Sequence, residues 1–265
     1  SMTKYTSEGE FGYWLCRKSN KWNHRQSIAT NTWFERCHVP PEVNMIITYS
    51  FARGDSFESA MKEASIYSTT ISAETVSDRY SFCREICMIS LDEEYGEHGL
   101  IGGHGKIVEI DECKIGRRKY ERGRVVEGSW IFGIIERDSN EYRLEICPDN
   151  SRSELTLLEL ICKHIAPGTT IYSDCWRGYM NLESHGYKHL TVNHSQNFVD
   201  PETGCNKQSI ESNWRPLRRF LSRGGIRHEN LDAHLCEFLW RRNVKKKGLE
   251  PFEKLIKDIA KIYSG

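Results

Sequence analysis

The sequence lacks the features that define several broad protein classes. None of its apolar runs approaches the roughly 18 residues that a membrane-spanning helix needs, so we expect no membrane partner. It has no net charge, because 37 Lys and Arg balance 37 Asp and Glu. Its 38% hydrophobic and 11% aromatic residues are too many for an intrinsically disordered chain. These absences leave a folded protein with a sizeable hydrophobic core.

Cysteine is present, but never in the C-x-x-C spacing that is typical of zinc sites. Ten cysteines in 265 residues are also too sparse for a disulfide-stabilised scaffold, so we expect free thiols. Cys83 and Cys87 are four residues apart and are interpreted as small side chains packed on one face of a helix. The sequence therefore predicts no bound zinc.

Charge is balanced in total but not along the chain. Residues 55–112 contain 13 acidic and four basic residues, whereas residues 206–247 contain 11 basic and four acidic ones. A second basic cluster lies just after Asp111 and includes Arg117, Arg118 and Lys119. Two basic clusters on either side of acidic residues indicate a polyanionic partner such as nucleic acid.

The first third of the chain is predicted to be helical. Apolar periodicity indicates helices over 43–51, 57–64 and 72–89, with Ser72 as the N-cap of the third. Three short helices in succession are typical of a helix-turn-helix module, which could contact DNA with one helix tip. A glycine-rich stretch over 92–105 then indicates a linker.

Beyond the linker the pattern changes to strands alternating with helices. Strands are predicted over 106–111, 129–135, 142–146, 169–174 and 189–192. A helix follows the third strand, with Ser151 and Glu154 as a capping box, and a short helix over 176–183 follows the fourth. Helices are also predicted over 209–222, 230–245 and 251–263. This order predicts an α/β fold with a mixed sheet covered by helices.

Three acidic residues occupy special positions in this predicted fold. Asp111 ends the first strand, Asp174 ends the fourth, and Glu211 lies in the first turn of the helix after the fifth. There are 62 residues between the first two acids and 36 between the second and third. Because α/β sheets bind ligands at strand ends, these acids are candidate site residues.

Four segments resemble the catalytic core of DDE transposases of the retroviral-integrase type. They are residues 108–112 (VEIDE), 171–179 (IYSDCWRGY), 192–195 (VNHS) and 209–214 (SIESNW). More narrowly, the segments and their order resemble the Merlin superfamily of cut-and-paste transposons and its bacterial insertion-sequence relatives. The resemblance covers about residues 107–244, and the 36-residue gap ending in Glu matches the Merlin form.

The resemblance implies an RNase H-like fold and a transposase that cleaves DNA at transposon ends and joins them to a target. It also implies two Mg²⁺ or Mn²⁺ ions held by Asp111, Asp174 and Glu211, with Asp111 bridging both metals. The chemistry agrees, because in-line displacement at a phosphodiester is catalysed by paired divalent ions. Such hard cations prefer carboxylate oxygens.

Neighbouring residues are expected to support this site. Glu109 lies on the same strand face as Asp111 and could help to position the metals, but a salt bridge at the rim of the site is the favoured interpretation. His194 follows the fifth strand and could help at the metals or a phosphate, or form ordinary hydrogen bonds in a loop. Trp214 is expected to pack in the core. Six basic residues are expected to bind backbone phosphates: Arg117, Arg118, Lys119, Arg215, Arg218 and Arg219.

The predicted domain organisation follows from these elements. Residues 14–18 (WLCRK) resemble the trailing half of the zinc ribbon with which relatives in this family often begin, but Cys16 has no partner cysteine two or three residues away. Residues 3–40 are therefore expected to be a remnant of such a region. Residues 41–91 form the helical module, 92–105 the linker, 106–247 the catalytic domain and 248–265 a C-terminal helix.

The expected partner is double-stranded DNA, as transposon terminal inverted repeats and target, bound by a homodimer or higher oligomer. The expected location is nuclear, or cytoplasmic if the source is prokaryotic. Two alternatives stay open: a descendant that binds DNA without catalysis, and an RNase H-like nuclease that cuts without joining.

Overall fold

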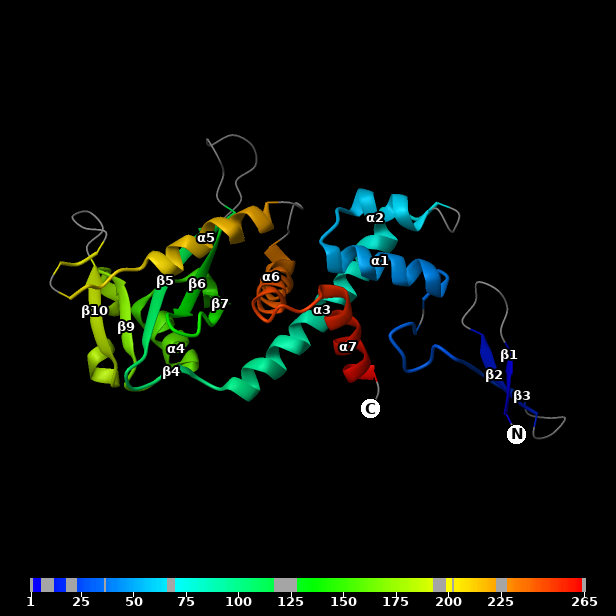
Figure 1. Cartoon of the computed structure of the whole chain (residues 1–265), viewed down its shortest axis with the longest axis horizontal. Helices are drawn as coiled ribbons and strands as arrows, with labels where there is room; N and C mark the ends of the chain where they lie inside the picture. Colours follow the sequence, from blue (N-terminus) through cyan, green and yellow to red (C-terminus); the bar gives the residue numbers. More distant parts are fainter. Residues whose placement is uncertain are drawn as a thin grey trace. The chain divides into compact units, whose positions relative to one another are not determined.

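The computed structural model describes residues 2–5, 12–17, 23–35, 37–65, 70–116, 128–192, 199–201, 203–222 and 228–263. The chain divides into two units, one formed by residues 1–90 and 240–265 and the other by residues 91–239 (Figure 1). No helix in the described ranges is long and apolar enough to cross a membrane.

The first unit contains a small antiparallel sheet and a group of helices. The strands, in sheet order, are β1 (Met2–Tyr5), β2 (Tyr13–Arg17) and β3 (Asn23–Ser27). The helices are α1 (Pro41–Arg53), α2 (Phe57–Ala64), most of α3 (Ala73–His98), the end of α6 (Leu231–Lys246) and α7 (Pro251–Tyr263). The sequence analysis identified the helices but not the three strands, because residues 10–40 show no clear alternation of apolar and polar residues.

Helix α3 is longer than predicted. Its N-terminus agrees, because the hydroxyl of Ser72 accepts a hydrogen bond from the backbone N–H of Thr75 at 3.1 Å. It continues to His98, however, so the first part of the predicted linker is helical. Gly96 is tolerated within the helix, and Gly99 ends it with a φ of 66° and an N–H that donates to Tyr95 O. The prediction that glycine interrupts the helix is therefore correct at Gly99 and wrong at Gly96.

Aromatic and small side chains form the core of the helical unit. The rings of Phe51 in α1 and Tyr80 in α3 meet edge to face, with centroids 5.2 Å apart. Cys83 and Cys87 are fully buried on α3, which agrees with their interpretation as packing residues. The helix-turn-helix assignment and the DNA contact of this module stay predictions.

The second unit is built on a five-stranded mixed sheet. In sheet order the strands are β10 (Lys188–Val192), β9 (Thr170–Asp174), β5 (Ile107–Ile115), β6 (Ser129–Glu136) and β7 (Tyr142–Ile146). Strands β5, β6 and β7 pair antiparallel, whereas β5, β9 and β10 pair parallel. Two short strands, β4 (Ile101–Gly102) and β8 (Ile165–Ala166), pair in parallel and form a separate two-stranded sheet. The predicted α/β fold with a mixed sheet is confirmed.

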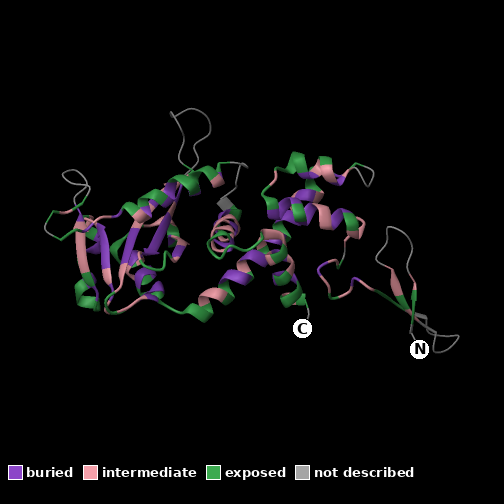
Figure 2. Ribbon diagram, viewed as in Figure 1, coloured by how far each residue is buried: buried purple, intermediate pink, exposed green. Residues whose placement is uncertain are grey.

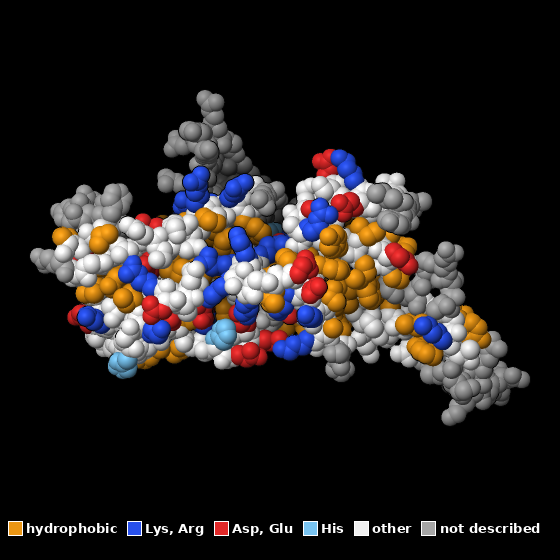
Figure 3. Space-filling model, viewed as in Figure 1, with side chains coloured by type: hydrophobic (Ala, Val, Ile, Leu, Met, Phe, Trp, Pro, Cys, Tyr) orange, Lys and Arg blue, Asp and Glu red, His pale blue; other side chains and the backbone are white. Residues whose placement is uncertain are grey.

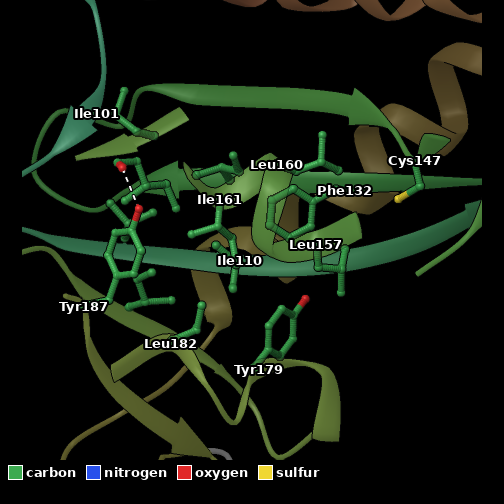
Figure 4. Packing of buried hydrophobic residues seen from close by; sticks show 14 residues of the cluster. Ile101, Ile110, Phe132, Cys147, Leu157, Leu160, Ile161, Tyr179, Leu182 and Tyr187 are labelled. Carbon is green, nitrogen blue, oxygen red and sulfur yellow. Dashed lines mark hydrogen bonds between the residues drawn. The ribbon is translucent and has the colours of Figure 1, made fainter. Parts of the chain in front are cut away.

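One face of this sheet is covered by α4 (Glu154–His164) and is apolar. Val108 and Ile110 of β5 are fully buried in a cluster with Leu157 and Ile161 of α4 (Figure 4). The same cluster includes Tyr187, whose hydroxyl donates to a backbone carbonyl of the cluster. Figure 2 shows the buried residues concentrated along β5, β6 and β9. The sheet is therefore held from this side by hydrophobic burial.

The N-cap of helix α4 lies two residues after the predicted cap. Ser153, not Ser151, accepts the hydrogen bond from the backbone N–H of Thr156, at 3.2 Å. The hydroxyl of Ser151 instead accepts from the N–H of Ser153, which closes the turn before the helix. Serine is a favoured N-cap residue at either position, and the capping-box spacing to Glu154 favoured Ser151, which is not the observed cap.

The segment predicted as a short helix over 176–183 is irregular. It forms two 3₁₀ turns, Arg177–Tyr179 and Leu182–His185, because Gly178 and Asn181 are poor helix formers. Further 3₁₀ turns occur at Pro148–Asn150 and His228–Asn230. Helix α5 (Gln208–Leu221) packs on the opposite face of the sheet from α4, against β5 and β6.

Candidate active site

The register between β5 and β9 brings Asp111 and Asp174 together. The parallel pairing runs from Ile107 opposite Thr170 to Glu109 opposite Tyr172. Asp111 and Asp174 each lie two residues further along, on the same face as that last pair. Asp111 does not end its strand, contrary to the prediction, because β5 stays paired with the antiparallel strand β6 as far as Ile115. Only its pairing with β9 ends before Asp111.

Glu109 fixes the start of the helix that carries Glu211. Its carboxylate is completely buried and accepts hydrogen bonds from Arg137 Nε at 2.7 Å and from the backbone N–H of Ile210 at 2.9 Å. Because Ile210 immediately precedes Glu211, this bond ties the first turn of α5 to β5. Glu109 is thus a buried anchor behind the acids and not a salt bridge at the rim.

Lys207 joins the three candidate acids. Its ammonium lies 2.9 Å from Asp111 Oδ1, 3.5 Å from Asp174 Oδ2 and 3.9 Å from Glu211 Oε1. The Lys207 side chain is 3% exposed, whereas those of Asp111, Asp174 and Glu211 are 14%, 36% and 42% exposed. Three acids from β5, β9 and α5 therefore surround one positive charge, with their outer sides open to solvent.

The acids keep this lysine charged. Burial lowers the pKa of Lys207, but Asp111, Asp174 and Glu211 together raise it by more, so the net pKa is above its ordinary value. One ammonium against three carboxylates leaves excess negative charge at the site. Within the described part of the chain, no three His, Cys, Asp or Glu side chains are grouped so that they could hold a metal ion directly. The three acids are grouped around Lys207 instead.

Trp214 orients Asp111 from the other side. Its indole N–H donates to Asp111 Oδ2 at 2.8 Å. The ring lies over Gly133, which is paired with Asp111 in the sheet, and a Cβ at Gly133 would come within 2.6 Å of that ring. Trp214 is buried, as expected, but its hydrogen bond was not foreseen. The sequence feature that could have indicated this hydrogen bond is the spacing of three residues between Glu211 and Trp214, which places the two side chains on neighbouring turns of the helix.

Asp174 and Glu112 are held by separate local contacts. The backbone N–H of Trp176 donates to Asp174 Oδ1 at 3.1 Å, which fixes the carboxylate in the turn after β9. Glu112 points to the opposite side of β5 from Asp111 and accepts a hydrogen bond from the Tyr179 hydroxyl. Burial raises the pKa of Glu112 to about 7. Glu112 does not join the three acids around Lys207.

Helix α5 also carries three of the six basic residues predicted to bind DNA. Arg215, Arg218 and Arg219 are exposed, and Figure 3 shows Lys and Arg side chains gathered over the C-terminal half of α5. Arg218 Nη2 also lies 2.9 Å from the Cys113 sulfur, which ties it to β5. The other three, Arg117, Arg118 and Lys119, lie outside the described residues, and so does His194, which was predicted to help at the metals or a phosphate.

The second unit is thus an α/β domain with a mixed sheet and three acids grouped around one buried lysine. The sequence matches the family described as "ISXO2-like transposase domain" over residues 99–243, more than half of the chain. The chain therefore belongs to the ISXO2-like transposase family. It is 32% identical over 89 residues to an "Uncharacterized transposase-like protein" of Haemophilus influenzae, a match that covers 33% of this chain and 71% of that protein.

Solved structures with a similar arrangement are catalytic cores of retroviral integrases. The HTLV-2 integrase catalytic core domain in complex with magnesium is 16% identical, with a TM-score of 0.34 over 54% of this chain and 86% of that one. The catalytic core domain of BIV integrase is also 16% identical, with a TM-score of 0.34 over 59% of this chain and 97% of that one. The predicted DDE transposase family is confirmed, while the narrower Merlin assignment stays a prediction.

Proposed function

We propose that this protein is a transposase that cleaves DNA and joins its ends at a site formed by Asp111, Asp174 and Glu211. The observation that carries the proposal is the convergence of these three acids, from two strands and a helix, around one buried cation. One carboxylate would balance the charge of Lys207, so the other two leave a net negative charge that suits a bound cation. Membership of a transposase family supports the same conclusion.

The residues fit divalent metal ions by their chemistry. The donors are all carboxylate oxygens, which Mg²⁺ and Mn²⁺ prefer, and they are partly open to solvent as ions that retain waters require. Asp111, Asp174 and Glu211 would hold the metals. Two such ions, when bound, supply activation of the attacking oxygen and charge neutralisation at the leaving oxygen. Because Lys207 now occupies the space among the acids, metal binding requires its ammonium to move away.

The surrounding residues keep the acids in place during that exchange. Glu109 anchors the start of α5 through Ile210, and Trp214 holds the second oxygen of Asp111. Neither contact involves Lys207, so both persist when the ammonium leaves. Arg215 and Arg219 on the exposed side of α5 would bind backbone phosphates of double-stranded DNA.

Cutting and joining two transposon ends further requires a dimer or larger assembly on DNA, and we include this in the proposal. The bacterial relative supports the cytoplasmic location over the nuclear one.

A second candidate function is DNA binding without catalysis. The observation that favours it is again Lys207, because its ammonium already neutralises part of the charge that would attract metal ions. In that case the acids and Lys207 would be a permanent salt-bridge network in a descendant that has lost its chemistry. The two candidate functions differ in whether a metal ion can displace the Lys207 ammonium.

The experiment is incubation of the full chain with labelled duplexes that carry candidate transposon ends, in Mg²⁺, in Mn²⁺ and in chelator. The Asp111→Asn variant is tested beside it. Metal-dependent nicking and joining that is lost in the variant would establish the transposase and its acids together. DNA binding without cleavage in any metal would favour the second candidate, and cleavage without joining would indicate a nuclease.

A further inference from the structure

Arg152 lies between two tryptophan rings beside the candidate active site. Its guanidinium carbon is 4.5 Å from the ring centroid of Trp130 and 4.9 Å from that of Trp176. The three residues come from different elements: Trp130 from β6, Arg152 from the turn before α4, and Trp176 from the turn after β9. Long-range folding thus assembles an arginine stacked against two indoles, which is a site that the sequence analysis did not identify.

The two tryptophans form a fixed support. The backbone N–H of Trp130 donates to Asn150 Oδ1 at 2.7 Å, and both rings are partly buried against the apolar cluster beneath α4. The ring of Trp176 meets Tyr179 edge to face and fills the space beside Gly178, where a Cβ would lie 2.0 Å from it. The stacked guanidinium therefore has few alternative positions.

The donors of Arg152 are not used within the structure. Among the described residues, the Arg152 guanidinium makes no hydrogen bond and no ion pair, and the side chain is exposed to solvent. Two other stacked arginines differ: Arg137 beside Tyr172 donates to Glu109, and Arg143 beside Tyr95 donates to Glu141. Stacking orders Arg152 without consuming its five N–H donors.

We propose that Arg152 binds a backbone phosphate of the DNA strand that is bound at the three acids. This inference rests on the proposed function. The indoles lie against the guanidinium, so its edge is the part that a ligand can reach. That edge matches two phosphate oxygens and suits neither an apolar ligand nor a cation. Lys114, whose ammonium is 5.6 Å from the Trp130 ring centroid, adds a second positive charge beside it.

The position of Arg152 between the two tryptophans indicates which phosphate it would bind. Trp176 is bonded through its backbone to Asp174, a proposed metal ligand, at 3.1 Å. The proposal thus places the contacted phosphate near Asp174, on the α4 side of the sheet.

The experiment measures binding of a labelled duplex to the full chain in chelator, as a function of NaCl. Wild type is compared with Arg152→Ala and with Arg152→Lys, which keeps the charge but not the planar fork. We expect Arg152→Ala to weaken binding by at least about tenfold, as for a lost charge-assisted hydrogen bond, and to reduce the salt slope by about one. Arg152→Lys should keep the slope but recover only part of the affinity. Thermal unfolding should be unchanged in both, because Arg152 is exposed.

A second arm replaces single phosphates of the duplex by neutral methylphosphonates. We expect one position near the cleaved bond to weaken binding by wild type but not to weaken Arg152→Ala further. If wild type binds the duplex with a normal salt dependence and Arg152→Ala is indistinguishable from it, this inference is wrong and the proposed function stands. If wild type shows no salt-sensitive binding, both are wrong.

Discussion

The two faces of the central sheet are built by opposite means. Toward α4, strand β5 presents Val108 and Ile110, which are fully buried among apolar side chains. Toward α5, the intervening residues Glu109 and Asp111 are charged and are held by hydrogen bonds from Arg137, Lys207 and Trp214. One strand thus alternates between a face that stabilises the fold and a face that arranges charges.

The difference shows where stability and function lie in this domain. Burial of apolar surface is non-directional and tolerates small changes in position. A buried carboxylate, by contrast, costs several kcal/mol unless specific donors reach it. The α5 face therefore needs exact partners, and loss of one should alter chemistry before it alters folding. Substitutions on the two faces should therefore differ in whether they reduce activity or stability.

The largest effect is expected for Asp111→Asn on the charged face. The amide removes the negative charge shared with Lys207 and the proposed metals, so DNA cleavage should fall by at least about 10³-fold. Glu112→Gln is the matched control, because Glu112 is the next residue and points to the opposite side of β5. Cleavage assays should find it active; equal loss in both variants would contradict the assignment.

Ile110→Ala tests the apolar face of the same strand. Removing these buried atoms should lower the free energy of unfolding by about 2–5 kcal/mol, whereas Ile110→Val should cost about 0.5–1.5 kcal/mol. Urea unfolding measures both. Cleavage per folded molecule should be preserved, and a selective loss of activity without loss of stability would show that the two faces are not separable.

Glu109→Gln is expected to reduce both stability and metal affinity, each by a moderate amount. The change leaves Arg137 without its carboxylate and weakens the bond from the Ile210 N–H, so we expect a loss of about 2 kcal/mol, less than for a fully buried pair because Arg137 is partly exposed. Metal affinity should fall as well, since Glu211 follows Ile210. Unfolding and Mn²⁺ titration are the two measurements. A stability loss with unchanged metal affinity would confine Glu109 to a structural role.

The smallest effect is expected on the exposed surface. Arg218→Ala combined with Arg219→Ala should reduce the slope of log affinity against log salt by about one to two. Lys163→Ala, an exposed residue of α4 that pairs with Glu145, is the control from the opposite face. DNA binding measured at several salt concentrations should leave the control slope unchanged. Similar slopes in all three proteins would place the phosphate contacts elsewhere.

Much of the second unit could be predicted from local patterns. The order of strands and helices and the three acids were visible because each acid lies in a short, recognisable segment at or near the end of an element. The helices at 57–64 and 251–263 were predicted with the observed bounds. These features depend on periodicity and turn residues within about 20 positions.

The contacts that complete the site could not be predicted in the same way. Lys207 reaches Asp111 across 96 positions of the chain, and Arg152 before α4 contacts Trp176 after β9. No local pattern marks such a lysine as the counter-ion of three acids. The strands β1 to β3 were missed for a related reason, because their pairing is not reflected in alternating hydrophobicity. Pairing and register decide these contacts, and both are long-range properties.

The most direct test of the account is a Mn²⁺ titration followed by electron paramagnetic resonance, comparing wild type with Lys207→Met. If the acids form a metal site from which Lys207 must withdraw, wild type binds Mn²⁺ and Lys207→Met binds it at least about tenfold more tightly, because the variant no longer has to displace the ammonium. In chelator the variant should also unfold at a lower temperature, since three acids are left without their counter-ion. Absence of Mn²⁺ binding at millimolar concentration in both proteins would contradict the account and leave the acids as a salt-bridge network alone.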